Sequence, residues 1–232
     1  MTARRAVVVG ASGSIGKALA DALQSRDFDV HRFSRSATCD KDRLDVEDEA
    51  SISRAAARCA QSGAPELVIV ATGVLKNDAV SPEKTWRQLD PQVLARYFAV
   101  NTIGPSIVAK HFLPLLPRKG RSVFAVLSAR VGSISDNHLG GWYGHRASKA
   151  ALNMMIRSLA VEAARVRPEA LCVALHPGTV ASELSRPFQA NVAPERLFTP
   201  SLAAERLLHV IDGLEPEASG RCYAWDGTLI EW

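Results

Sequence analysis

The stretch RRAVVVGASGSIG, from Arg4 to Gly16, runs from a strand-like series of valines into a glycine-rich loop. An apolar run rich in β-branched residues is typical of a strand buried on both faces. Gly10, Gly13 and Gly16 leave the turn without side chains, so its backbone can approach a pyrophosphate closely. Three glycines alone are a weak signal, but their place between a first strand and a helix predicts a dinucleotide-binding loop. The residues expected to form this loop are Gly10, Ser12, Gly13, Ser14, Ile15 and Gly16.

Strand and helix patterns alternate along the rest of the chain. Strands are predicted over residues 4–10, 27–33, 42–46, 66–73, 121–129, 169–178 and 220–225. Helices are predicted over residues 14–26, 47–61, 91–116 with a bend at Pro105, 142–167 and 200–213. This order predicts an α/β fold, a doubly wound parallel sheet of about seven strands with helices on both faces, known as the Rossmann fold. We expect one domain over residues 1–232, with its ligand at the carboxyl ends of the strands.

Composition narrows the class of protein. The chain has 232 residues, 47% of them hydrophobic and 22% charged, which suits a folded globular domain. A net charge of +4 without a long basic run argues against a nucleic-acid partner. The four cysteines are far apart and no histidine cluster has ligand spacing, so neither disulfides nor a metal site is expected. The apolar stretch after Arg5 is too short for a signal peptide or a membrane span, so we expect a cytoplasmic protein.

The end of the second predicted strand indicates which dinucleotide is bound. An NAD site usually places an acid here to bind the ribose hydroxyls. This chain has Ser34 followed by Arg35, and a guanidinium suits the 2′-phosphate of NADP that a carboxylate would repel. The sequence therefore favours NADP(H) over NAD(H). Arg32 is the alternative phosphate partner, and Arg35 as a solvated surface residue is the competing interpretation.

Three phrases in the second half of the chain carry a family resemblance. They are RVGSISDN at 130–137, GGWY with RASKAALN within 140–153, and WDGTLIEW at 225–232. Together with the glycine loop, they make the chain resemble the short-chain dehydrogenase/reductase family over essentially its whole length, and within it the C-factor-like group. The commonest glycine spacing of that family would put glycine at position 14, where this chain has Ser14 beside Gly13.

The resemblance implies further cofactor contacts. Asp45 and Val46 match an acid–apolar pair that frames adenine, and Gly73 is the secure match in a shortened motif after the next strand. The turn HPGTVAS implies that Pro177, Gly178, Val180 and Ser182 lie at the nicotinamide and its carboxamide.

The resemblance also implies a mechanism, and here the chain departs from the family. A tyrosine exchanges the substrate proton during hydride transfer, a lysine one helical turn later binds the ribose, and a serine polarises the carbonyl. Lys149 matches the lysine, and Asn101 matches an asparagine that holds a water beside it. The tyrosine position is His145 and the serine position is Ala129.

Neighbouring side chains are candidates for the missing groups. Tyr143 lies six residues before Lys149 and is expected on another helix face, while Ser128 or Ser133 are alternative hydroxyls. His145 is itself a candidate acid, although imidazole is shorter than phenol by about 2 Å and a cationic neighbour should keep it neutral. His176 is interpreted as a structural or pocket-wall residue.

Two functions therefore stay open. One is an NADP(H)-dependent oxidoreductase that reduces a small carbonyl or oxidises an alcohol, with Lys149, Asn101, His145 and Ser128 at the reacting centre. The other is a catalytically silent or weakly active dinucleotide-binding or signalling protein. The resemblance implies a homodimer or homotetramer, and neither a membrane nor a nucleic-acid partner is expected.

Overall fold

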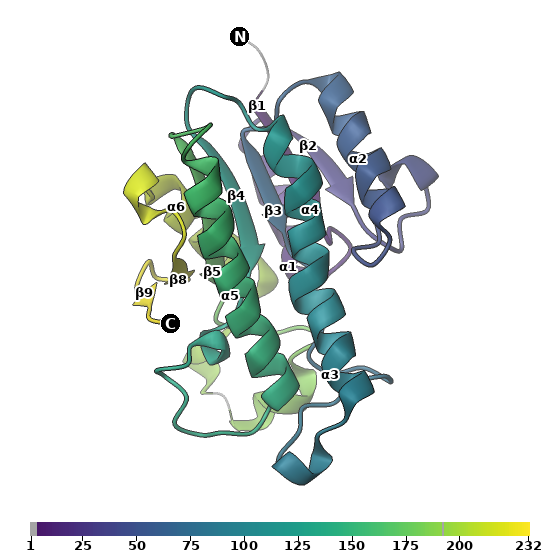
Figure 1. The fold of residues 1–232 in the computed structure, drawn as a ribbon, viewed down its shortest axis with the longest axis vertical. Coiled ribbons are helices and arrows are strands. Elements are labelled where there is room, and N and C mark those ends of the chain that lie inside the picture. Colours follow the sequence, from purple (N-terminus) through teal and green to yellow (C-terminus); the bar gives the residue numbers. More distant parts are fainter. Residues whose placement is uncertain (1–3, 192) are drawn as a thin grey trace.

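The computed structural model describes residues 4–191 and 193–232 and has a seven-stranded sheet at its centre (Figure 1). Its strands lie in the order β2-β1-β3-β4-β5-β8-β9. The first six are parallel and β9 is antiparallel to β8. Their bounds are β1 Arg4–Val9, β2 Phe28–Phe33, β3 Leu67–Val70, β4 Ser122–Leu127, β5 Ala170–His176, β8 Cys222–Ala224 and β9 Leu229–Ile230. A separate pair joins β6 Thr179–Val180 and β7 Leu197–Phe198. The predicted doubly wound parallel sheet is confirmed.

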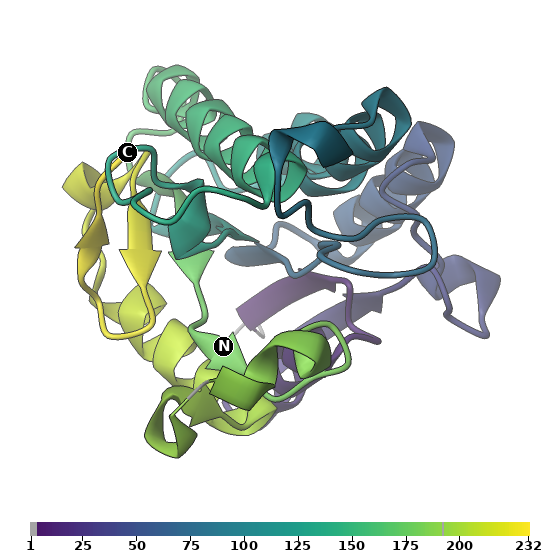
Figure 2. The same cartoon turned by 90° about the horizontal axis from the view of Figure 1, so that it is seen from below.

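Two layers of helices enclose the sheet, which Figure 2 shows from its lower edge. The helices are α1 Ser14–Gln24, α2 Glu49–Ser62, α3 Pro91–Phe98, α4 Gly104–Phe112, α5 Tyr143–Ala163 and α6 Pro200–Gly213. Apolar side chains of α1 and α6 pack on one face, and those of α2, α4 and α5 pack on the other. Because both faces are covered, β3 and β4 are buried at every residue.

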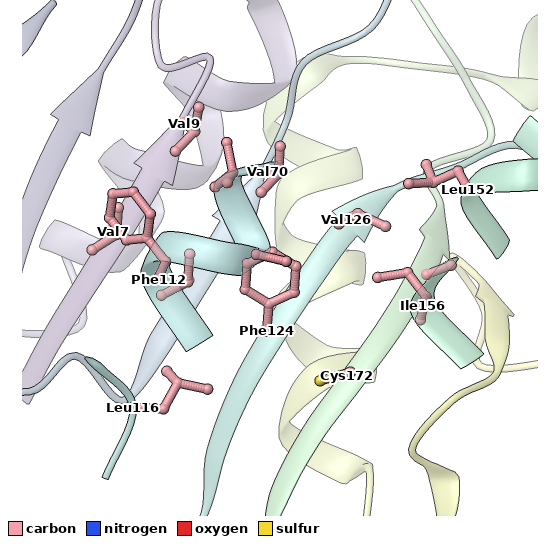
Figure 3. Close-up of a cluster of buried hydrophobic side chains, with 14 of the residues drawn as sticks. Val7, Val9, Val70, Phe112, Leu116, Phe124, Val126, Leu152, Ile156 and Cys172 are labelled. Atoms are coloured by element: carbon pink, nitrogen blue, oxygen red, sulfur yellow. The ribbon is translucent and has the colours of Figure 1, made fainter. Parts of the chain in front are cut away.

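The larger core cluster lies under α4 and α5 (Figure 3). Phe112 of α4 and Phe124 of β4 are fully buried in it, beside Leu152 and Ile156 of α5. Leu152 and Ile156 face the sheet at helical spacing along α5. The residues before them, at the amino end of α5, lie near the edge where the strands finish. The core therefore fixes the position of α5, which carries Lys149.

The order in which strands are added to the sheet changes side at β1: β2 lies on one side of it and β3 on the other. β1 pairs with β2 on one side and with β3 on the other, so the loops after β1 and β3 diverge at their carboxyl ends. Such a switch point opens a crevice between neighbouring loops, and ligands of doubly wound sheets bind there. The predicted glycine loop follows β1 directly at this point.

The predicted strand over residues 42–46 is wrong. Residues Asp40–Asp42 form a single 3₁₀ turn, and only Arg43 forms an isolated bridge, with Ser34. The acidic side chains bond to nearby amides instead: Asp45 accepts from Glu47, and Asp48 caps α2 by accepting from Ala50. Aspartates favour such local turns over a ladder. The seventh strand is therefore β9, which the sequence did not indicate.

The single bent helix predicted over residues 91–116 is also divided. A π-helical segment, Ala99–Ile103, separates α3 from α4, and α4 ends at Phe112. Proline has no amide hydrogen, and its ring crowds the carbonyl four residues earlier. Pro105 therefore disturbs the turn at Asn101, and the wider π turn accommodates it. The irregular turn therefore lies before the proline, at Ala99–Ile103.

Candidate functional site

A cavity of about 930 Å³ opens at the carboxyl ends of the strands. Loops after β1, β3, β4 and β5 and the amino end of α5 surround it. Of the predicted site residues, its lining includes Ser12, Gly13, Ser14, Ile15, Gly73, Ser128, His145, Lys149, Pro177, Gly178, Val180 and Ser182. The cavity therefore brings together residues that are up to 170 positions apart in sequence, as the difference between Ser12 and Ser182 shows.

The glycine loop fits a dinucleotide. Gly10 has a φ of +90°, and a Cβ on Gly16 would lie 2.2 Å from the Gly10 carbonyl oxygen. Gly13 caps α1 without a side-chain hydrogen bond, and the first turn of α1 holds no acidic residue. The amides of this helix start, with the positive end of its dipole, are thus available to an anion. Beside the loop, the buried Thr72 hydroxyl has no partner among the described residues.

Lys149 and Asn101 lie at the centre of the cluster. The Lys149 ammonium donates to the Leu127 carbonyl at 2.8 Å. The Asn101 amide pairs with the Val74 backbone in both directions and donates to the Ser148 hydroxyl. A Cβ on Gly73 would make ordinary contact with Asn101 Oδ1 at 3.4 Å and Lys149 Nζ at 3.5 Å, so this position borders both groups. Asn101 is fully buried behind the cavity lining.

His145 lies beside Asn101 and is buried. Because Val74 fixes which atom of the amide is nitrogen, Asn101 Nδ2 faces His145 Nδ1, at 3.5 Å. The two hydrogens of this amide nitrogen already go to the Val74 carbonyl and the Ser148 hydroxyl, so the contact leaves the position of the ring hydrogen open. Burial, with the nearby Lys149 charge, lowers the pKa of His145 to about 3. His145 is therefore a neutral hydrogen-bond donor at pH 7 and carries no acidic proton to transfer.

Lys149 is perturbed in the same direction. Burial lowers its pKa from 10.5 to about 8, because the charged form loses solvation. At neutral pH the Lys149 side chain is still protonated. It is thus a cationic group in the wall of the cavity and also one with a labile proton.

The alternative hydroxyls are placed differently. Ser128 lines the cavity, but its hydroxyl donates to Asn153 of α5 at 2.8 Å. Ser133 bonds within its own loop, to Ser135 and the Asp136 amide. Neither Ser133 nor Tyr143 belongs to the described lining of the cavity, whereas Ala129 does. The geometry therefore leaves Ser128 as the hydroxyl nearest the predicted serine position.

The end of β2 lies beside the glycine loop. The amides of Gly10 and Ala11 both donate to the Phe33 carbonyl. Ser34 follows and is buried, and Arg35 is exposed without an ion pair or side-chain hydrogen bond among the described residues. The competing candidate, Arg32, is already paired with Asp21 at 2.7 Å and with Gln24. Arg35 is thus the arginine available to a ligand here.

The predicted adenine pair lies next to this edge but outside the cavity lining. Val46 packs against α4, where a Cβ on Gly104 would come within 2.8 Å of it. Asp45 is half-buried and bonds to Ser51 through its backbone. The structure does not bring either residue into contact with the glycine loop.

The turn after β5 is supported by an aromatic cage. A Cβ on Gly178, whose φ is +75°, would meet Phe198 at 2.6 Å and Trp225 at 2.9 Å. The Arg206 guanidinium lies over both rings, 4.3 Å and 4.2 Å from their centroids. The sequence analysis did not identify Arg206 or Phe198, because no local pattern links α6 and β7 to this turn. Phe198 packs against Gly178, and Arg206 packs on Phe198.

His176 also lines the cavity, as expected of a pocket-wall residue. Its Nδ1 is buried and has no partner among the described residues, and burial lowers its pKa to about 4. Both imidazoles at this site are therefore neutral in the folded protein.

Acid should destabilise the fold through these imidazoles. In the unfolded chain, His145 takes up a proton below pH 6.5, whereas in the folded chain it stays neutral down to about pH 3. The free energy of unfolding therefore decreases as the pH falls across this window. The loss is about 1.4 kcal/mol per pH unit for one such group. Urea unfolding measures the free energy of unfolding at about pH 7 and about pH 5. Between these two pH values, His145→Asn should lose about 2 kcal/mol less of this free energy than wild type. His138→Asn, in an exposed loop, is the control, and an equal loss in all three proteins would contradict the expectation.

No group of three or more potential metal ligands occurs within residues 4–191 and 193–232. In the same part of the chain, none of the helices has the length and apolarity needed to cross a membrane.

Comparisons with known proteins agree with this geometry. The family model described as short chain dehydrogenase matches residues 4–193. The chain is 32% identical to the 1-hydroxy-2-glutathionyl-2-methyl-3-butene dehydrogenase of Rhodococcus sp. (strain AD45), over 97% of this chain and 98% of that one. It is 39% identical to the C-signal protein of Myxococcus xanthus, over 60% and 78% of the two chains. The NADPH-bound carbonyl reductase from chicken fatty liver is similar in fold, with a TM-score of 0.80 at 23% identity and full coverage of both chains.

Proposed function

The chain belongs to the short-chain dehydrogenase family, and from this premise we propose that it is an NADP(H)-dependent oxidoreductase that reduces a small carbonyl compound. The observation that carries the proposal is the single cavity wall shared by the glycine loop, Lys149 and His145. A dinucleotide held on that loop would extend along the strand ends toward Lys149 and the turn at Gly178. NADPH, when bound, supplies the hydride.

Each group at the reacting centre has a distinct proposed role. The Lys149 ammonium binds the nicotinamide ribose, and Asn101 holds His145 and α5 in register through Ser148. His145 donates the N–H of its neutral ring to the carbonyl oxygen and stabilises the charge that develops there. Ser128 supplies a second polar contact if it turns from Asn153. Because a neutral imidazole does not release a proton, the product oxygen takes its proton from Lys149 or solvent, and turnover is slow.

NADP preference rests on Arg35. A guanidinium at the 2′-phosphate forms charge-assisted hydrogen bonds worth about 1.5–3 kcal/mol, so Arg35→Ala should weaken NADPH binding about tenfold to a hundredfold. NADH affinity should stay unchanged, since that cofactor has no phosphate there. Titration of both cofactors by nicotinamide fluorescence measures the ratio. Arg32→Ala, which removes a guanidinium paired with Asp21, is the matched control. An unchanged ratio in Arg35→Ala would remove Arg35 as the phosphate contact.

A second candidate function is dinucleotide binding without turnover. Two observations favour it: Ala129 has no hydroxyl, and His145 is neutral where the family resemblance implies a tyrosine acid. The similarity to C-signal makes a signalling role its natural form. Both candidates require NADPH binding, and only the first requires consumption of NADPH with a carbonyl panel. Measuring both quantities on the wild-type protein separates them.

We also propose that the protein is cytoplasmic and pairs as a homodimer or homotetramer. The outer layer of helices leaves several large apolar side chains exposed, which suits a subunit contact. They are Ile103, Met154, Met155 and Val161.

A further inference from the structure

The cavity has an aromatic wall beside the predicted reacting centre. The rings of Trp142 and Phe188 contact each other, with centroids 4.9 Å apart and planes tilted by 59°. Trp142 also lies edge-on to His145, with centroids 6.2 Å apart. All three residues line the cavity. The group proposed to contact the carbonyl oxygen therefore adjoins an aromatic surface.

The backbone of Trp142 is held in an unusual conformation. Its φ of 53° and ψ of 39° are left-handed, which is rare for a bulky residue and persists only where surrounding contacts enforce it. Here the contacts come from Glu83, which is buried. Its carbonyl accepts from the Trp142 amide at 2.6 Å, and its carboxylate accepts from the Gly144 amide at 3.2 Å. The backbone that carries the indole is thus held by contacts within the protein.

Phe188 reaches the wall from a distant segment. It belongs to the 3₁₀ turn Arg186–Asn191, and its amide donates to the Ser185 carbonyl. Gln189 strengthens this turn by donating to the Ser185 hydroxyl at 2.7 Å. Leu184, before the turn, and Val131, after β4, add apolar surface to the same cavity. Two segments with no sequence relationship therefore supply one apolar surface.

We propose that this wall selects carbonyl compounds that carry an aromatic ring next to the carbonyl, that is, aryl aldehydes and ketones. The inference rests on the proposed reductase function and adds its substrate class. Aromatic pairs prefer tilted or edge-to-face contact at centroid separations of about 4.5–7 Å and gain about 0.5–1.5 kcal/mol beyond area burial. The Trp142–His145 separation is within that range. An aryl ketone whose oxygen meets His145 has its ring on the Trp142–Phe188 wall.

The test compares acetophenone with cyclohexyl methyl ketone, which replaces the flat ring with a saturated one. Calorimetry on the NADPH-loaded protein measures the affinity of each ketone. Trp142→Ala and Phe188→Ala should each weaken acetophenone binding about twofold to tenfold more than they weaken binding of cyclohexyl methyl ketone, whose saturated ring loses only the apolar contact. Trp142→Phe should retain most of the affinity. Trp86 is an exposed tryptophan outside the cavity lining, so Trp86→Ala is the matched control. It should leave the affinities for both ketones unchanged.

NADPH affinity and the thermal midpoint confirm that each variant is folded. Acetophenone binding that is absent in wild type, or equal in wild type and both alanine variants, overturns the inference. Equal losses for both ketones overturn it as well, since the wall would then be merely apolar. If the variants lose acetophenone affinity as expected but no protein consumes NADPH, the aromatic subsite stands and the proposed reductase function fails. If carbonyl turnover occurs but is indifferent to Trp142 and Phe188, the function stands and the substrate class is wrong.

Discussion

The double variant His145→Tyr with Ala129→Ser should turn over carbonyl substrates about a hundredfold faster than the wild type, since a positioned general acid contributes about 10²–10⁴ in rate. In wild type, burial and the Lys149 charge lower the His145 pKa to about 3, so this group has no acidic proton at pH 7. A phenol at position 145 lies one helical turn before Lys149, whose charge favours the phenolate and so makes the phenol a better acid. The serine hydroxyl adds a donor at Ala129, which already lines the cavity.

The comparison needs kcat, KM and NADPH affinity for four proteins: wild type, each single variant and the double variant. His145→Phe is the matched control, because it keeps a ring and removes every polar atom. We expect His145→Phe to fall below wild type, since it loses the N–H donor of the imidazole, while NADPH affinity stays constant throughout. Equal activity in wild type and His145→Tyr would show that position 145 does not limit the rate. Absence of turnover in every variant, with NADPH bound, would instead support the non-enzymatic candidate.

Local sequence predicted those parts of the fold that depend on local physics. The valines of β1, the glycine loop and the start of α1 at Ser14 follow from neighbours a few residues apart, and each was confirmed. The strand predicted over residues 42–46 was wrong because a strand needs a partner in register. There, Asp45 accepts from the Glu47 amide and Asp48 accepts from the start of α2 instead. The short β9 was missed for the same reason, since its pairing with β8 creates it.

The candidate site shows the same division. Lys149 and His145 were expected at the site from the family resemblance, and both line the cavity. The direction of the Ser128 hydroxyl depends on Asn153, and the conformation of Trp142 depends on Glu83, 59 residues earlier (142 minus 83). Such long-range contacts leave no periodic signal in the chain. The resemblance therefore indicated part of the cavity lining, whereas the packing of Phe198 and Arg206 and the direction of the Ser128 hydroxyl needed the structure.

Gly16→Ala should destabilise the fold by about 3 kcal/mol, the upper range for forcing an extra methyl group into a packed region. The added Cβ would lie 2.2 Å from the Gly10 carbonyl oxygen and 2.8 Å from its carbon, and backbone atoms cannot turn aside as a flexible side chain does. The gain in helix propensity of alanine over glycine, about 1 kcal/mol, offsets only part of this. α1 must therefore move from the loop, and the phosphate-binding amides move with it. Urea unfolding measures the loss of stability, and NADPH titration measures the loss of cofactor binding.

Gly13→Ala separates the two effects, because its Cβ would lie 3.4 Å from the same Gly10 oxygen and its φ of −74° suits alanine. We expect stability to change by less than about 1 kcal/mol, the usual cost of alanine at a helix cap. NADPH affinity should still fall at least about tenfold, since the methyl group occupies the approach to the helix amides. Gly213→Ala, at the end of α6 with no atom within 4 Å of its Cβ, controls for helix propensity alone. If Gly13→Ala binds NADPH with wild-type affinity, the loop does not hold the pyrophosphate, and the dinucleotide site proposed for this glycine-rich stretch is wrong.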